Sequence, residues 1–129
     1  MRSFRHALAA AALLAALAPA AHAADLFTSV SQAQDGTPLY CTIVNVGSTP
    51  VVVSASVRSM TDGSDLTVTD TCQPAPATLA PGTACIAYSS QSGVHSGYCH
   101  FTSTSSKVRA NLMIFATNGD VLTTIPATR

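Results

Sequence analysis

Residues Leu39–Met60 read LYCTIVNVGSTPVVVSASVRSM, and this stretch decides the fold. Apolar side chains alternate with other side chains on both sides of a short connector, residues 45–50. A two-residue repeat rich in β-branched side chains indicates half-buried strands and disfavours a helix. We therefore expect two strands onto which the rest of the chain stacks. The residues that share the expected buried faces are Leu39, Cys41 and Ile43 before the connector, and Val51, Val53, Ala55 and Val57 after it.

Further strands are expected along the rest of the chain, at a spacing of about ten residues. The longest alternation places Val108, Ala110, Leu112, Ile114 and Ala116 on one face. After the first twenty-three residues, no segment shows the period of a helix. The pattern predicts an all-β, antiparallel sandwich of about seven or eight strands. The other expected strands are Leu26–Val30, Leu66–Cys72, Ala84–Tyr88, Tyr98–Ser103 and Val121–Ile125.

Turn-forming residues separate these strands. Asp62-Gly63 and Asn118-Gly119-Asp120 are hairpin signals, and Ala80–Thr83 suits a type II turn with glycine at the third position. Residues 73–83 contain three prolines and therefore cannot run inside a sheet. We expect residues 89–97, SSQSGVHSG, to form a polar, flexible loop.

Residues 1–23 have the features of a cleaved signal peptide. Arg2 and Arg5 precede an apolar run over Ala7–Ala18, and Ala21-His22-Ala23 fits the small-x-small cleavage pattern. A membrane anchor or a buried helix is the alternative, but a spanning helix needs about 20 apolar residues. The sequence therefore predicts one soluble domain over residues 24–129, exported to the periplasm or secreted.

The charge of the predicted mature chain argues against several partners. Residues 24–129 carry four basic and six acidic side chains, a formal balance of −2. This balance gives no electrostatic footprint for nucleic acid or an anionic membrane. The expected partner is a protein or a carbohydrate, and the ligand and the oligomeric state stay open.

All four cysteines, Cys41, Cys72, Cys85 and Cys99, lie in the predicted mature chain. An even number in a small exported chain indicates two disulfides, and three connectivities are possible. We favour a local Cys72–Cys85 bridge across the proline-rich turn together with a long-range Cys41–Cys99 bridge. Chain-entropy arguments give about 3 and roughly 4 kcal/mol of stabilisation, respectively. Zinc is the competing interpretation, but the sequence has no C-x-x-C spacing.

Two segments resemble bacterial extracellular immunoglobulin-like modules. Asn45–Val53 resembles their N-x-G-x-x-P element with its valine-rich strand, and Leu79–Thr83 resembles their L-x-P-G element. Over about Leu39–Ala116, the chain resembles the CARDB-like group, which is similar in architecture to fibronectin type III. The resemblance implies an immunoglobulin-like sandwich of about seven strands that binds or spaces rather than catalyses.

The chain departs from this group in several ways. We expect a stand-alone exported domain with two disulfides rather than one repeat of a large surface protein. A Cys41–Cys99 bridge resembles the inter-sheet disulfide of immunoglobulin domains. However, the sequence has no Trp, and Tyr98 precedes Cys99 by one residue rather than the two of a tyrosine corner.

No catalytic or metal-binding motif stands out in the sequence. His95 lies in the expected loop, and His100 alternates with Cys99 on the expected outer face. A triad or metal site with an aspartate can be drawn, but no local signature supports it, and solvated surface histidines are the better interpretation. We predict no enzyme activity, no cofactor and no bound metal.

Other polar groups also have simple structural explanations. Residues 62–65 resemble a fragment of a calcium loop, but a hairpin turn explains them better. Arg58, Lys107 and Arg109 could share a surface, although solvated side chains that protect strand edges explain them better. Tyr88, His95 and Tyr98, in or beside the expected loop, are the possible ligand contacts, and the two tyrosines could form a small platform for carbohydrate or peptide.

These observations support three hypotheses about function. The leading one is an exported, non-catalytic binding or structural accessory module. The second is a subunit of a surface fibre or pilus joined by strand addition, which requires an incomplete sandwich with an exposed groove. The third is a small secreted enzyme or enzyme inhibitor, with the disulfide-closed segment Cys72–Cys85 as the inhibitory loop.

Overall fold

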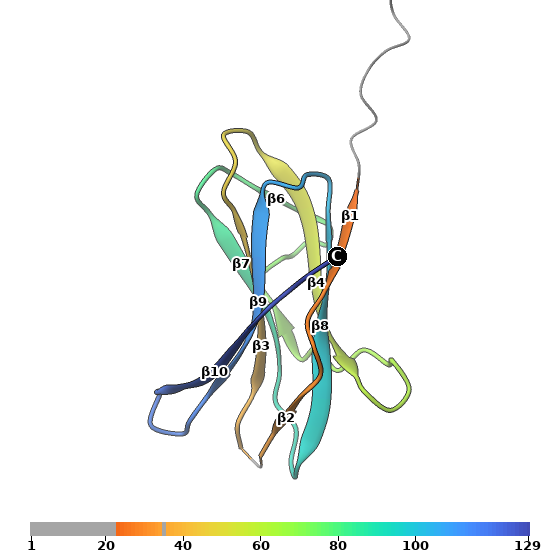
Figure 1. Ribbon diagram of the computed structural model, residues 1–129, viewed down its shortest axis with the longest axis vertical. Coiled ribbons are helices and arrows are strands. Elements are labelled where there is room, and N and C mark those ends of the chain that lie inside the picture. The colour runs from red at the N-terminus through yellow and green to blue at the C-terminus, as the bar shows by residue number, and fades with distance from the viewer. Residues whose placement is uncertain (1–22, 35) are drawn as a thin grey trace, which may run out of the picture.

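The computed structural model describes residues 23–34 and 36–129 (Figure 1). All but the last residue of the predicted signal peptide lies outside this range. The described part contains ten strands and no helix. The strands are β1 (Ala24–Phe27), β2 (Ser31–Ala33), β3 (Leu39–Asn45), β4 (Val51–Ser59), β5 (Thr69–Asp70), β6 (Ala77–Leu79), β7 (Ala84–Ser89), β8 (His95–Ser103), β9 (Val108–Phe115) and β10 (Val121–Pro126).

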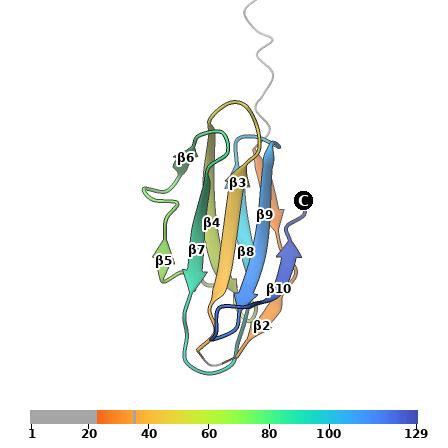
Figure 2. The same cartoon turned by 90° about the vertical axis from the view of Figure 1, so that its left-hand side faces the viewer.

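The strands form two antiparallel sheets that pack face to face (Figure 1). Sheet A has the order β1-β8-β4-β6, with β2 also paired to β8. Sheet B has the order β10-β9-β3-β7-β5, and Figure 2 looks onto it. The structure therefore confirms the predicted all-β sandwich.

The alternation read from the sequence sets the inner face of each sheet. In β3, β4 and β9, every second residue is buried, as predicted. Side chains of one sheet interdigitate with those of the other to form one core. The largest fully buried apolar side chains are Leu39, Ile43, Val51, Val53, Val57, Phe101 and Leu112.

The two strands that decide the fold lie in opposite sheets, so they face each other instead of pairing. The connector between them therefore crosses the core at one end. Asn45, which is fully buried, holds this crossing. Its Nδ2 donates to the carbonyls of Thr49 and Leu79, and its Oδ1 accepts from the Gly47 N–H. The side chain thus links the connector to the turn after β6.

The structure contains both favoured disulfides. Cys41–Cys99 joins β3 of sheet B to β8 of sheet A through the middle of the core, with a Cα–Cα distance of 5.5 Å. Cys72–Cys85 ties the segment after β5 to β7, with a Cα–Cα distance of 5.1 Å. Two intramolecular disulfides indicate an oxidising, extracytoplasmic compartment.

The first expected strand, Leu26–Val30, is wrong in its bounds because Thr28 interrupts the pairing. The chain forms β1 before Thr28 and β2 after it, and both strands pair with β8. The Thr28 N–H donates to the Cys99 carbonyl, while its Oγ1 accepts from the Cys99 N–H. A side-chain oxygen therefore takes the place of a backbone acceptor at this point.

The expected strand Leu66–Cys72 shortens to the two residues of β5 for a similar reason. Thr67 Oγ1 accepts from the Val57 N–H, and Asp65 Oδ1 accepts from the Thr67 N–H. These side-chain hydrogen bonds favour a turn over a ladder. In the proline-rich segment, β6 forms as a short edge strand, which proline permits.

The polar segment 89–97 is shorter as a loop than predicted, because β8 begins at His95. His95 is wrongly predicted as a solvated residue, since it is only 8% exposed and faces the core. The Ala80–Thr83 turn is confirmed: Gly82 has φ +75°, and the Thr83 N–H donates to the Ala80 carbonyl.

The C-terminal segment crosses from sheet B to sheet A (Figures 1 and 2). The Ala127 N–H donates to the Ala110 carbonyl in β9. One residue later, Thr128 exchanges two backbone hydrogen bonds with Phe27 in β1. This segment therefore partly closes the flank of the sandwich between β1 and β9.

Replacement of Asn45 by alanine should lower the free energy of unfolding by about 3 kcal/mol, because it leaves buried backbone groups unpaired. Asn118 is a matched control: it also makes local hydrogen bonds in a turn, but it is exposed. Asn118→Ala should cost less than about 1 kcal/mol. Urea denaturation measures both values, and equal losses would contradict the role assigned to Asn45.

Removal of the Cys41–Cys99 bridge should destabilise the protein more than removal of the Cys72–Cys85 bridge. The two loops span 58 and 13 residues, so the chain-entropy losses are about 4 and roughly 3 kcal/mol. Guanidinium denaturation of the two double alanine variants tests the order. A larger loss from the short loop would show that unfolded-chain entropy does not set the ranking.

Candidate functional site

The three predicted ligand contacts lie in three different places. Tyr88 in β7 points outward from sheet B, and Tyr98 in β8 points outward from sheet A. His95 lies inside the core between them. The two-tyrosine platform considered from the sequence does not form, because the loop between β7 and β8 crosses from one sheet to the other and separates the two rings.

Tyr88 instead belongs to an aromatic cluster on the outer face of sheet B. Tyr40 in the central strand β3 is paired in register with Tyr88 in β7. The Tyr40 and Tyr88 ring centroids are 5.3 Å apart. Phe115 at the end of β9 meets the Tyr40 ring edge to face, with a centroid distance of 5.0 Å and an interplanar angle of 85°. Such tilted and edge-on contacts are favourable arrangements for aromatic rings.

A shallow hollow of about 440 Å³, which we call the aromatic pocket, lies beside this cluster. Its volume is within the usual range for small-molecule sites, and its lining carries no charged side chain among the described residues. Two turns, one before β3 and one after β9, form its rim. The lining residues are Gly36, Pro38, Tyr40, Ile86, Met113, Phe115, Ala116, Thr117 and Gly119.

This pocket was not predicted from the sequence. Tyr40, Ile86, Met113 and Phe115 each occupy an outward position of a correctly predicted alternation. What the sequence lacked was the order of the strands, because β3 lies between β7 and β9 only in the folded sheet. The available signal was the run of large apolar side chains at positions expected to face solvent.

His100 lies on the outer face of sheet A, as predicted. Its ring stacks on Phe27 at 4.6 Å, and its Nε2 lies 3.4 Å from Asp25 Oδ1. A triad would also need a serine hydroxyl hydrogen bonded to this histidine. Ser56 is its register neighbour, but the Ser56 hydroxyl accepts from Arg58 Nε at 3.0 Å. In the described part, the Asp25–His100 pair thus has no serine aligned with it.

The candidate metal ligands are also separated. His95 faces the core while His100 faces outward, so the two do not converge. Within residues 23–34 and 36–129, no group of three or more His, Cys, Asp or Glu is arranged to hold a metal ion. In the same residues, no helix has the length and apolarity needed to cross a membrane.

Residues 62–65 form the hairpin turn that the sequence favours. Asp62 Oδ1 accepts from both the hydroxyl and the N–H of Ser64, and Gly63 has φ +69°. The hydrogen bonds from Ser64 hold the pKa of the Asp62 carboxyl below its ordinary value. The carboxylate therefore caps its own turn, which is the role expected of an aspartate followed by glycine.

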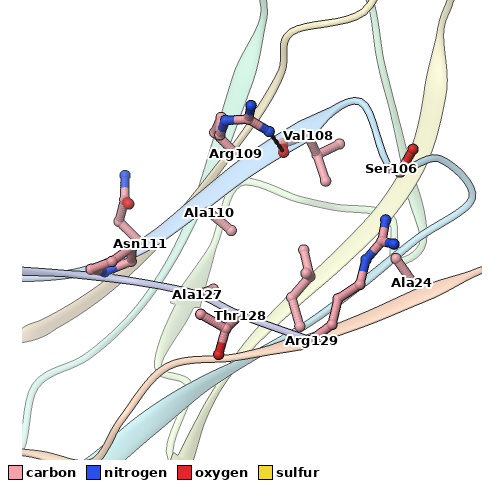
Figure 3. Close-up of a pocket in the computed structure, with 11 residues that line it drawn as sticks. Ala24, Ser106, Val108, Arg109, Ala110, Asn111, Ala127, Thr128 and Arg129 are labelled. Atoms are coloured by element: carbon pink, nitrogen blue, oxygen red, sulfur yellow. Dashed lines mark hydrogen bonds between the residues drawn. The ribbon is translucent and has the colours of Figure 1, made fainter.

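The basic side chains do not form the shared surface considered from the sequence. Arg58 lies in β4 of sheet A, whereas Lys107 precedes β9 of sheet B and Arg109 lies within it. Arg109 instead borders a hollow of about 360 Å³ on the flank between β1 and β9, where Arg129 also lies (Figure 3). Its floor includes the core residues Leu26 and Val108, so the sandwich is not fully closed here.

No family model matches the chain, and no curated protein or solved structure matches it either. The resemblance to immunoglobulin-like modules therefore depends on the motifs Asn45–Val53 and Leu79–Thr83. The function has to be argued from the surfaces described above.

Proposed function

We propose that the protein is an exported, non-catalytic β-sandwich that binds a neutral carbohydrate in the aromatic pocket. The observation that carries this proposal is the cluster of Tyr40, Tyr88 and Phe115 beside an uncharged hollow on the outer face of sheet B. This face belongs to a rigid sheet rather than a loop, so the rings are held in place before a ligand arrives.

Carbohydrate chemistry fits this pocket for two reasons. A sugar ring has an apolar C–H face that packs against aromatic rings, and a rim of hydroxyls that hydrogen bonds to polar groups. Tyr40 offers both an apolar ring and a hydroxyl, and Thr117 at the rim adds another hydroxyl. Among the described residues, the lining carries no charged side chain, which favours a neutral sugar over an acidic one.

Export and the absence of catalysis are supported by separate observations. Two disulfides indicate an oxidising compartment, and the predicted signal peptide at residues 1–23 would deliver the chain to the periplasm or the outside of the cell. Among the described residues, His100 lacks an aligned nucleophile. A ligand that binds without being transformed is consistent with both.

Loss of the Tyr40 ring should weaken carbohydrate binding by about tenfold or more, because stacking and pocket shape are lost together. The test screens the mature protein against an array of neutral oligosaccharides and then measures affinity by calorimetry. Tyr40→Leu and Phe115→Leu retain apolar side chains suited to the strands, while removing the rings.

Tyr98→Leu is the matched control, because Tyr98 is also an outward-facing tyrosine but belongs to sheet A. Its affinity should stay within about twofold of the unmodified protein. Binding to no neutral glycan would refute the proposal. Equal losses in all three variants would also refute it, since a general effect on folding would then be the cause.

The flank hollow favours a second candidate, a fibre subunit joined by strand addition. Between β1 and β9, the core residues Leu26 and Val108 line an open groove of about 360 Å³ (Figure 3). A donated strand could cover such a groove. Light scattering of the mature protein over a wide concentration range separates the candidates: the carbohydrate module stays monomeric, whereas a fibre subunit assembles.

A further inference from the structure

The outer edge of β4 in sheet A is covered by two different segments. Near its start, Val51 and Val53 pair with Leu79 and Ala77 of β6. Near its end, Val57 bonds to the segment that precedes β5: its carbonyl accepts from the Leu66 N–H, and its N–H donates to Thr67 Oγ1. Ala55 lies between these two covered stretches.

The backbone of Ala55 points into the gap between the two segments. In an antiparallel strand, alternate residues direct both backbone groups to the same side. Val53 and Val57 direct their backbone N–H and C=O to the outer edge. Val52 directs its groups to the opposite side, where its C=O accepts from the N–H of Thr104, the residue after β8. Ala55 has the same parity as Val53 and Val57, so its N–H and C=O face the outer edge.

No described residue completes the ladder at this position. The β6 partner opposite Ala55 would be Ala75, but the Ala75 N–H donates to Gln73 Oε1 instead. Pro74 and Pro76 on either side of Ala75 have no N–H to offer. An unpaired backbone donor and acceptor at a residue that is only 7% exposed is uncommon in folded proteins.

The gap opens into a polar groove of about 540 Å³ on sheet A. Because the Ala55 side chain faces the core, Ala55 lines this groove through its backbone. We call this place the Ala55 slot. The groove is lined by Ser54, Ala55, Ser56, Arg58, Asp65, Thr67, Val68, Asp70, Gln73, Ala75 and His100.

The charged side chains around the Ala55 slot already have partners within the protein. Asp70 accepts from the Cys72 N–H and from Gln73 Nε2. Asp65 accepts from the Thr67 N–H, and Arg58 Nε donates to the Ser56 hydroxyl. The groups left to recognise a ligand are therefore the neutral N–H and the neutral C=O of Ala55 itself, which point to the same side of β4.

We infer that the Ala55 slot binds an extended peptide segment, which inserts one residue between β6 and the Leu66–Thr67 segment and pairs with Ala55. A peptide residue in strand conformation offers one N–H and one C=O on the same side, which is the complement of this site. The site belongs to sheet A and is separate from the aromatic pocket of sheet B, so it is independent of the proposed carbohydrate binding.

The test selects ligands from a phage-displayed library of linear seven-residue peptides on the mature protein. The selected peptides are then measured against Ala55→Pro. Proline removes the Ala55 N–H, which has no partner among the described residues, and edge positions of this kind tolerate proline. The affinity should fall by about tenfold, the equivalent of one lost hydrogen bond and a ring blocking the slot.

Thr124→Pro is the matched control. Thr124 lies in the edge strand β10. The Ala127 N–H bonds to β9, so Ile125, two residues earlier, also directs its N–H to β9. Thr124 alternates with Ile125, so its N–H faces away from β9. This variant carries the same substitution at a similar edge position of the other sheet, and it should bind the selected peptides unchanged. Equal binding to Ala55→Pro and the unmodified protein overturns the inference, as does selection of no peptide.

Hydrogen exchange of the unmodified protein gives a readout that does not depend on a variant. The Ala55 amide should exchange faster than the amides of Ser54 and Ser56, which pair with β8, and a selected peptide should slow it by about tenfold or more. An Ala55 amide as protected as its neighbours in the free protein would contradict the inference. Protection by a neutral oligosaccharide instead of a peptide would assign the slot to carbohydrate and overturn the peptide assignment.

Discussion

The crossing from β3 to β4 is the constraint on which the rest of the sandwich depends. Two consecutive strands with the same alternating pattern end in opposite sheets, so the chain must turn across the end of the core. Backbone groups buried in such a turn need partners, and the amide of Asn45 supplies them for Gly47, Thr49 and Leu79. Gly47 is required in the same turn, since a Cβ atom there would lie 2.9 Å from the Lys107 Cβ. A polar side chain, rather than an apolar one, thus specifies which strands face each other.

The crossing places β3 and β4 in opposite sheets, and the outer faces of these two sheets differ in chemistry. Sheet B directs Tyr40, Met113 and Phe115 outward, whereas sheet A directs Ser54, Ser56 and His100 outward. The Cys41–Cys99 bridge joins β3 of sheet B to β8 of sheet A between these two faces. An apolar aromatic face and a polar face, back to back, allow one small domain to present two unrelated binding surfaces.

The sequence could predict the inner faces, the turns and the number of disulfides, because each depends on local pattern or on cysteine number. It left three disulfide connectivities open, and the structure contains the favoured one. It could not predict which strands pair, since a two-residue period looks the same for a strand that pairs with its neighbour and for one that faces it. This is why Tyr88 and Tyr98 seemed to belong together, and why the cluster around Tyr40 was missed. The predicted strand bounds were wrong where a side-chain hydroxyl replaced a backbone hydrogen-bond partner, as at Thr28 and Thr67. The prediction that His95 is solvated was wrong, because the polar composition of residues 89–97 indicated a loop where β8 begins.

The gap at Ala55 results from the same features of the sequence that protect the edge of sheet A. Edge strands risk pairing with other chains, and proteins limit that risk with proline and with short edges. Here Pro74 and Pro76 keep β6 from beginning before Ala77, and the Leu66–Thr67 segment covers the end of β4 with one backbone and one side-chain hydrogen bond to Val57. The two segments, β6 and Leu66–Thr67, do not meet along β4. A single ladder position, Ala55, therefore stays unpaired and recessed below the surface. A recessed position is too short to template the pairing of whole sheets, yet it offers one strand residue a specific partner. Protection of the edge and selective recognition of a peptide therefore arise from the same pair of prolines.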